Sequence, residues 1–216
     1  DLDPSKKLKA GFDVYKNSPP NLVGSITIHT DFAETEGDAR MLNLTRFPLY
    51  YPEKRTFFLE GSDIFDFGST SSSTFLPFFS RRIGLIEGEQ VPLKWGTKLF
   101  GKIKNTNLAL LDVQSGSMEL TSPTNMFAGR ISQNIFDESK VGVILTNGSQ
   151  SGKQNTLAGA DFKYKTSRFM GGDNFTVDLW GVKNWNEATG GNKNGFGLKI
   201  DYPNDLIDAA VSYSFF

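Results

Sequence analysis

Residues 91–103, VPLKWGTKLFGKI, alternate apolar and polar side chains with a period of two. One face of an extended strand then carries Val91, Leu93, Trp95, Thr97, Leu99 and Ile103. The opposite face carries Lys94, Lys98 and Lys102. Because successive side chains of a β-strand point to opposite faces of its sheet, the stretch predicts a strand with one apolar and one polar face.

The same alternation recurs along the chain. The segments that follow it are LKAGFDV (8–14), SITIH (25–29), AGADFKYK (158–165), FTVDL (175–179), FGLKIDY (196–202) and AAVSYSF (209–215). Period two over so many segments predicts an all-β protein made of antiparallel strands. A soluble two-sheet sandwich and a transmembrane β-barrel both produce this alternation, so the pattern leaves both open.

The connections between the predicted strands favour the barrel. A tight KNTN turn (104–107) and a short PNDL turn (203–206) contrast with the longer SGSMELTSPTN (115–125) and NWNEATGGNKN (184–194). Short turns at one end and longer loops at the other are typical of outer-membrane barrels. We therefore expect the N-terminal portion of an antiparallel transmembrane β-barrel.

Residues 32–77 interrupt the alternation with a segment rich in both aromatic and charged side chains. A structureless loop of that length is uncommon in a compact domain, so we expect a folded insertion that acts as a plug or cap. The predicted organisation is a first β-hairpin of the wall in residues 1–31, the insertion in 32–77, and antiparallel wall strands in 78–216.

Composition excludes several classes of protein. The chain has 23 Lys and Arg against 24 Asp and Glu, which gives no support to a nucleic-acid partner. It has no cysteine and one histidine, His29, so thiolate and multi-histidine metal sites are excluded within it. No apolar run is long enough for a transmembrane helix. No cofactor is predicted.

A longer motif carries a family resemblance. Residues 30–68, TDFAETEGDARMLNLTRFPLYYPEKRTFFLEGSDIFDFG, are followed by PFFSRRIGL (77–85). This motif resembles outer-membrane proteins of Gram-negative bacteria that carry a domain like carbohydrate-binding family 9. In that family a domain of unknown function follows, and it is expected to form a β-barrel. The resemblance implies an outer-membrane location and contact with lipid, a glycan as possible ligand, and no established catalytic residues.

Charged residues of the motif are the candidate ligand-binding side chains. They are Arg46, Glu53, Arg55, Glu60, Arg81 and Arg82. The two arginines at 81 and 82 could bind an anionic group, and the two glutamates could form the carboxylate pair of a glycoside hydrolase. The plainer interpretation of the glutamates is buried arginine–carboxylate pairing, and no catalytic residue is assigned.

The acidic cluster of Asp31, Glu34, Glu36 and Asp38 is a weak candidate for a calcium site. It lacks the residue order of an EF-hand loop, and balance by Arg40 and Arg46 is the simpler interpretation. No metal is predicted.

The expected function is membrane anchoring combined with binding or passage of an extracellular ligand, by family analogy a glycan. The alternatives are a soluble β-sandwich that binds carbohydrate or protein, and a glycan hydrolase. The strand candidates number about ten or eleven, whereas single-chain bacterial barrels use even numbers of strands. In addition, the short and long connections do not alternate consistently through residues 86–107. We therefore predict a curved, unclosed wall that the remainder of the same chain completes.

Overall fold

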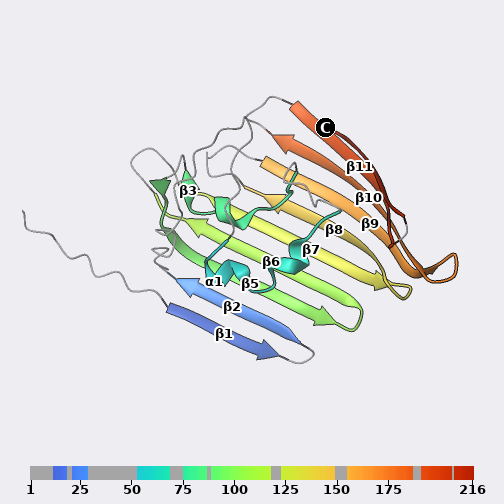
Figure 1. Cartoon of the computed structure of the whole chain (residues 1–216). Helices are drawn as coiled ribbons and strands as arrows, with labels where there is room; N and C mark the ends of the chain where they lie inside the picture. The colour runs from blue at the N-terminus through green and yellow to red at the C-terminus, as the bar shows by residue number, and fades with distance from the viewer. Residues whose placement is uncertain are drawn as a thin grey trace, which may run out of the picture.

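The computed structural model describes residues 12–18, 21–28, 53–68, 75–86, 89–117, 123–148, 155–186, 191–205 and 207–216. Ten strands form one antiparallel sheet in which every strand pairs with the wall strand next to it along the chain (Figure 1). They are β1 (Phe12–Ser18), β2 (Leu22–Ile28), β5 (Leu93–Ile103), β6 (Thr106–Ser115), β7 (Asn125–Ile135), β8 (Ser139–Asn147), β9 (Asn155–Phe169), β10 (Asp173–Asn186), β11 (Gly191–Pro203) and β12 (Asp208–Phe215).

The sheet is open. The strand order begins at β1 and ends at β12, and these two strands do not pair with each other. The prediction of an all-β antiparallel fold is therefore confirmed, and so is the prediction of an unclosed wall.

Residues between β2 and β5 supply the remaining elements. These are α1 (Thr56–Leu59), η2 (Ser62–Phe65), η3 (Ser80–Arg82), β3 (Leu85–Ile86) and β4 (Glu89–Gln90). Strands β3 and β4 form a separate two-stranded sheet, so they lie outside the ten-stranded sheet, which resumes at Leu93. Residues 53–68 and 75–83, here called the covering segment, pack against one face of the wall. We call that face the inner face and the opposite one the outer face.

The register of β5 corrects one detail of the sequence prediction. The pairing of β5 with β6 is irregular between Leu93 and Trp95. Because of this irregularity, Leu93 is buried at the inner face, whereas Trp95 is exposed on the outer face. The assignment of Val91 and Leu93 to the same face as Trp95 was therefore wrong, since one extra residue in a ladder shifts the side chains that follow it. Beyond the irregularity, Lys98 lies on the inner face as predicted.

Connection lengths differ between the two ends of the sheet. At one end, the turn end, adjacent strands are joined by three (19–21), two (104–105), three (136–138), three (170–172) and four (204–207) residues. At the other, the long-connection end, the links are residues 29–92 and then nine (116–124), seven (148–154) and four (187–190) residues. The structure thus has the segregation that the sequence indicated.

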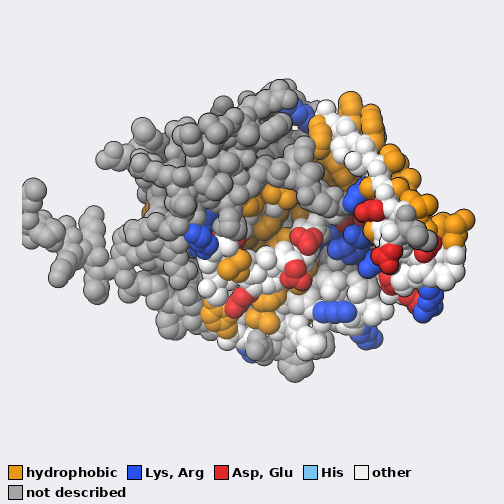
Figure 2. Space-filling model, viewed as in Figure 1, with side chains coloured by type: hydrophobic (Ala, Val, Ile, Leu, Met, Phe, Trp, Pro, Cys, Tyr) orange, Lys and Arg blue, Asp and Glu red, His pale blue; other side chains and the backbone are white. Residues whose placement is uncertain are grey.

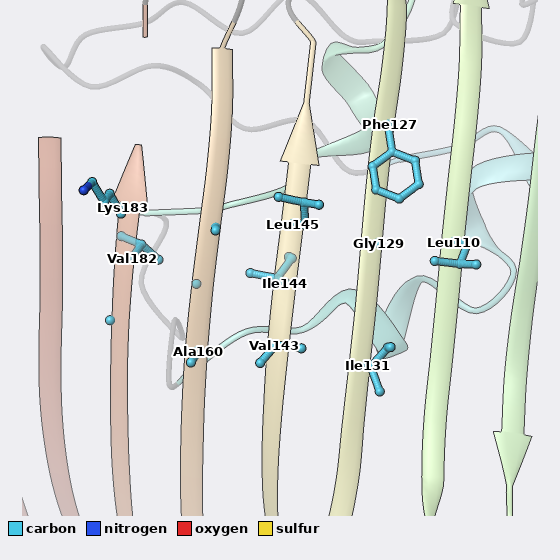
Figure 3. A pocket seen from close by; sticks show the side chains of 13 residues that line it. Leu110, Phe127, Gly129, Ile131, Val143, Ile144, Leu145, Ala160, Val182 and Lys183 are labelled. Atoms are coloured by element: carbon cyan, nitrogen blue, oxygen red, sulfur yellow. The ribbon is translucent and has the colours of Figure 1, made fainter. Parts of the chain in front are cut away.

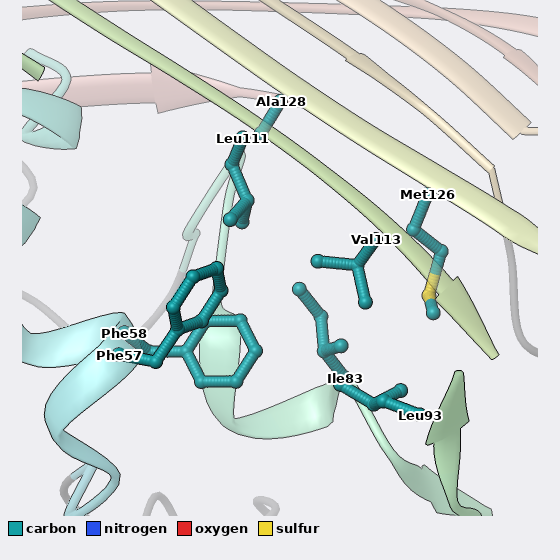
Figure 4. Packing of buried hydrophobic residues seen from close by; sticks show 8 residues of the cluster. All are labelled: Phe57, Phe58, Ile83, Leu93, Leu111, Val113, Met126 and Ala128. Atoms are coloured by element: carbon teal, nitrogen blue, oxygen red, sulfur yellow. The ribbon is translucent and has the colours of Figure 1, made fainter. Parts of the chain in front are cut away.

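Two hydrophobic clusters join the covering segment to the inner face. In the first, Phe57, Phe58 and Ile83 pack against wall side chains from β5, β6 and β7 (Figure 4). These wall residues are Leu93, Leu111, Val113, Met126 and Ala128. In the second cluster, Phe67 packs against side chains of β8, β9 and β10, namely Ile144, Leu157 and Trp180. On β6 to β10 the wall residues of both clusters lie in the half of the strand nearer the long-connection end.

Candidate functional site

Charged side chains of the inner face gather where the hydrophobic clusters end. In the space-filling view from the inner side, acidic and basic groups lie together beside the covering segment (Figure 2). They belong to the middle and the turn-end half of the wall strands. A polar, charged surface next to an apolar one on the same face of a sheet marks this boundary as the candidate functional site.

Arg55 anchors the beginning of the covering segment. Its Nε and Nη2 donate to the two carboxylate oxygens of Glu53 at 2.8 and 2.7 Å. The same guanidinium donates to the backbone carbonyls of Ile83 at 2.6 Å and Ser80 at 2.8 Å, and it lies 4.2 Å above the ring of Phe58. One buried arginine therefore ties residues 53–58 to residues 80–83, as charge-assisted bidentate pairing allows.

The pKa of Glu53 reflects this environment. Burial is the largest single influence and raises the pKa of the carboxyl, but the hydrogen bonds and charge of Arg55, with the hydroxyl of Ser80, together lower it below its usual value. Glu53 is thus held as a carboxylate by an arginine. A group in that state is a poor proton donor, and this weighs against its use as the acid of a glycosidase pair.

Lys98 anchors the helical turn α1 from the wall side. Its ammonium donates to the backbone carbonyl of Phe57 and, at 2.7 Å, to that of Glu60. It also lies 5.1 Å from the ring centroid of Phe57 and 4.6 Å from that of Phe100. The last carbonyls of a helical turn lack partners within it, so a cation from β5 satisfies them.

Arg130 and Asp161 form the most buried ion pair among the described residues. Arg130 on β7 donates through Nη1 and Nη2 to the two oxygens of Asp161 on β9, at 2.5 and 2.8 Å. The two side chains are 0% and 2% exposed. Asp161 also accepts the backbone N–H of Gly68 at 3.1 Å, and the guanidinium lies 5.2 Å from the ring centroid of Phe67. The pair therefore holds residues 67–68 on the wall.

Strand β8 lies between β7 and β9, and a glycine on it lets Arg130 reach Asp161. Gly142 on β8 pairs with Asp161 of β9 on one side and with Ser132 of β7 on the other. A Cβ placed on Gly142 would approach the guanidinium of Arg130 to 2.8 Å. The missing side chain thus opens the space through which Arg130 crosses β8.

Beyond this pair the inner face carries a row of alternating charge. Lys163 on β9 pairs in register with Asp178 on β10, which pairs in turn with Lys199 on β11. The Lys163 ammonium lies 3.6 Å from the buried Asp178 carboxylate, and Lys199 donates to Asp201 at 2.7 Å. These side chains form a polar surface that the described part of the covering segment leaves partly open to solvent.

The predicted site residues are only partly brought together. Glu53 and Arg55 form one unit, and the Glu60 backbone is bound by Lys98. Arg81 is buried within η3. Their role in binding a ligand remains a prediction.

Arg82 is exposed and lines a cavity of about 430 Å³ together with Phe78, Phe79, Asn147 and Asn155. Its predicted role with an anionic ligand likewise remains a prediction.

The acidic cluster and Arg46 fall elsewhere. Asp31, Glu34, Glu36, Asp38 and Arg46 lie outside the described residues. Within the described part of the chain, no group of three or more His, Asp or Glu side chains is arranged to hold a metal ion.

The sequence prediction missed Arg130. Lys98 was placed on a polar strand face, and Asp161 lies in a segment of predicted alternation. Alternation gave neither partner, because Lys98 binds carbonyls of the covering segment and Arg130 on β7 is separated from Asp161 on β9 by a whole strand. Arg130 lies on β7 in the stretch FAGRISQ (127–133). The available signal was a lone arginine whose neighbours two positions away on the same strand face, Ala128 and Ser132, are both small.

Comparison with known proteins found one family profile that matches part of the chain. Residues 4–109 match the profile described as "Domain of unknown function (DUF5916)". The match spans β1, β2, the covering segment and β5, so it includes the motif on which the resemblance rests. No curated protein and no solved structure matches the chain. No helix among the described residues is long and apolar enough to cross a bilayer.

Proposed function

We propose that this chain is the leading part of an outer-membrane β-barrel, which anchors the protein and serves the binding or passage of an extracellular ligand, by family analogy a glycan. The observation that carries the proposal is the sidedness of the sheet: its inner face buries polar and charged side chains, and its outer face exposes apolar ones.

On the outer face the exposed apolar side chains come from nearly every wall strand. They include Ile26, Ile28, Trp95, Ile131, Val141, Val143, Leu145, Tyr164, Leu179, Phe196, Leu198, Ile200, Val211, Tyr213 and Phe215. An apolar patch of this extent is rare on monomeric proteins in water. In a barrel the same surface faces lipid, where it is favourable.

The inner face has the opposite character outside the two hydrophobic clusters. Its buried polar side chains include Ser25, Thr27, Lys98, Arg130, Ser132, Asp161, Thr176 and Asp178. A soluble sandwich would place its apolar faces together and its polar faces in water. The described residues contain no second sheet that covers the outer face, since the only other one consists of two two-residue strands. The arrangement therefore supports the barrel over the sandwich.

The two open edges support a larger assembly of strands. An edge strand carries unpaired backbone N–H and C=O groups, which are costly in lipid. We propose that strands from the remainder of the same chain pair with β1 and β12 and close the wall.

The covering segment lies at the long-connection end of the lumen in this proposal. Long loops of outer-membrane barrels are extracellular, so Phe57, Phe58 and Phe67 would close the extracellular mouth. Lys98 and the Arg130–Asp161 pair hold this cap on the wall, and Arg55 joins the two parts of the cap to each other. Passage of a ligand then requires release of the cap, whereas binding alone does not.

Fractionation of the cell that makes the full-length protein tests the proposal. We expect the protein in the outer-membrane fraction after a urea or carbonate wash, released only by detergent. A lipoprotein and a periplasmic protein of the same cell serve as the two reference markers. Recovery of the intact protein in the soluble fraction would overturn the membrane placement.

A further inference from the structure

We infer that the outer face carries a binding site for one acyl chain of an anionic membrane lipid, with its headgroup phosphate on Lys183. The inference rests on the membrane placement proposed above. The site is a hollow of about 620 Å³ that crosses β6 to β10.

The hollow is made by small side chains beside large ones. Ala158, Ala160 and Gly181 form its floor on β9 and β10, and Val143 and Leu145 of β8 rise beside them (Figure 3). The register places these residues on one face, since Val143 pairs with Ala160 and Ala160 with Gly181. An apolar hollow in an otherwise filled surface loses dispersion contacts unless something occupies it.

Packing within the chain does not explain why the side chains that form the floor of the hollow are so small. A Cβ placed on Gly181 would meet no atom closer than 4.0 Å, so packing within the protein does not require a glycine there. By contrast, a Cβ on Gly197 of the neighbouring strand would come within 2.5 Å of Trp180. The glycine of the inner face makes room for the protein's own side chain, whereas Gly181 leaves room for a molecule outside the protein.

Charge identifies the kind of molecule. Lys183 is the only charged side chain among the described residues that line the hollow. It lies at the long-connection end of β10, and its ammonium is 5.2 Å from the ring of Trp185. Tryptophan and lysine gather at the membrane–water interface of barrels, so this end of the hollow meets the headgroups and the remainder meets the acyl chains. A lipid with an anionic phosphate matches both ends.

The test uses the full-length protein extracted in mild detergent and freed of lipid. Phosphatidylglycerol and phosphatidylcholine with identical acyl chains are added back separately, and native mass spectrometry counts the lipids retained. We expect one phosphatidylglycerol to be retained more tightly than phosphatidylcholine, by about fivefold, the factor that about 1 kcal/mol for one lysine at an anionic membrane surface provides.

Two variants with matched controls separate the two halves of the site. Ala160→Leu fills the hollow and should abolish the retained lipid, whereas Ala209→Leu, also exposed on the outer face but on β12, should not. Lys183→Gln should remove the preference for phosphatidylglycerol and leave retention of phosphatidylcholine unchanged. Lys193→Gln, on the adjacent strand and facing the inner side, should keep the preference.

The outcomes distinguish this inference from the proposal beneath it. If the protein is embedded in the membrane but Ala160→Leu retains as much lipid as the unaltered chain, the hollow is not a lipid site. A phosphatidylglycerol preference that survives in Lys183→Gln overturns the role of that lysine. If all four variants lost retained lipid to the same extent, the lipid binding would be adventitious and the hollow would not be a site. A protein that needs no detergent to stay in solution overturns the membrane placement and the site together.

Discussion

The inner face of the wall has two halves with different chemistry. Near the long-connection end it is apolar, with Leu111 and Val113 of β6 packed beneath Phe57 and Phe58. Toward the turn end of the wall it is polar and charged, as at Lys163 on β9 and Asp178 on β10. The boundary between the halves follows the reach of the covering segment, not the limits of any strand.

The covering segment determines which side chains a wall strand can carry on its inner face. Where the segment lies on the sheet, a strand is covered on its inner face and also exposes apolar groups outward, so both faces are apolar. This explains the run LALL (108–111) in β6. Where the described covering segment does not reach, as at residues 163–165 of β9, the inner face meets water and alternation is strict. Four experiments test this contrast.

The largest effect is expected at the boundary itself. Arg130→Leu leaves the Asp161 carboxylate buried without a counter-charge and should lower the free energy of unfolding by about 3–5 kcal/mol. Urea unfolding of the full-length protein in phosphocholine vesicles, followed by tryptophan fluorescence, measures it.

Arg168→Leu is the control for this change, because its pair with Asp137 is 82% and 83% exposed and should contribute about 0–1 kcal/mol. The double variant Arg130→Leu, Asp161→Leu should recover part of the loss. Equal stability of the Arg130→Leu and Arg168→Leu proteins would contradict a buried pair.

The apolar half should respond next. Leu111→Ala removes a side chain packed beneath Phe57 and Phe58, and the cavity should cost about 2–5 kcal/mol. Hydrogen exchange should increase within residues 53–60. Leu110→Ala, one position along on the outer face, is the matched control, because lipid can fill the space that it leaves. Similar losses in both variants would argue that the outer face is packed against protein.

A charged side chain on the outer face should lower the free energy of unfolding slightly less than the Leu111→Ala cavity does. Leu179 is 43% exposed, so arginine there would be well tolerated in water. In a bilayer the substitution Leu179→Arg should cost about 2–4 kcal/mol near the midplane. Asp205→Arg, in the turn of residues 204–207, is the control and should be close to neutral. Urea unfolding in phosphocholine vesicles measures the free energy of unfolding of both variants. A Leu179→Arg protein as stable as the unaltered protein would contradict the assignment of this face to lipid.

The smallest effect is expected in the dependence of folding stability on acidic pH. The pKa of Glu53 is lowered in the folded chain from its usual 4.5, so its stabilising contribution is complete above that value and is lost as the pH falls through the lowered pKa. Burial, the largest influence on Asp66, raises the pKa of that carboxyl, so its contribution has the opposite sign and folding gains as Asp66 is protonated.

Hydrogen exchange of residues 53–60 against pH should therefore show an acid-induced opening that Glu53→Gln removes and Asp66→Asn makes steeper. The pH dependence is compared, not the absolute stability. An unchanged profile in Glu53→Gln would show that the Arg55 anchor does not depend on this carboxylate.

Much of the wall could be predicted from its sequence. Alternation in residues 158–165 and 196–202 identified strands and their polar faces correctly, because side chains of a strand can only alternate. Prediction failed where a local irregularity intervened, at Val91 and Leu93. Alternation also gave no sign that Trp180 packs with Phe67 and Phe75, because those two residues lie outside the strands of the wall.

The sequence by itself determined the strands, their turns and the two-faced character of the wall, since these depend on neighbours one or two positions apart. Only the tertiary structure decided which face is covered, that Arg130 crosses β8 to reach Asp161, and that Lys98 caps α1. These contacts join residues 31 and 38 positions apart in the chain. No local pattern encodes such pairs, because each depends on the register of intervening strands and on the path of the covering segment over them.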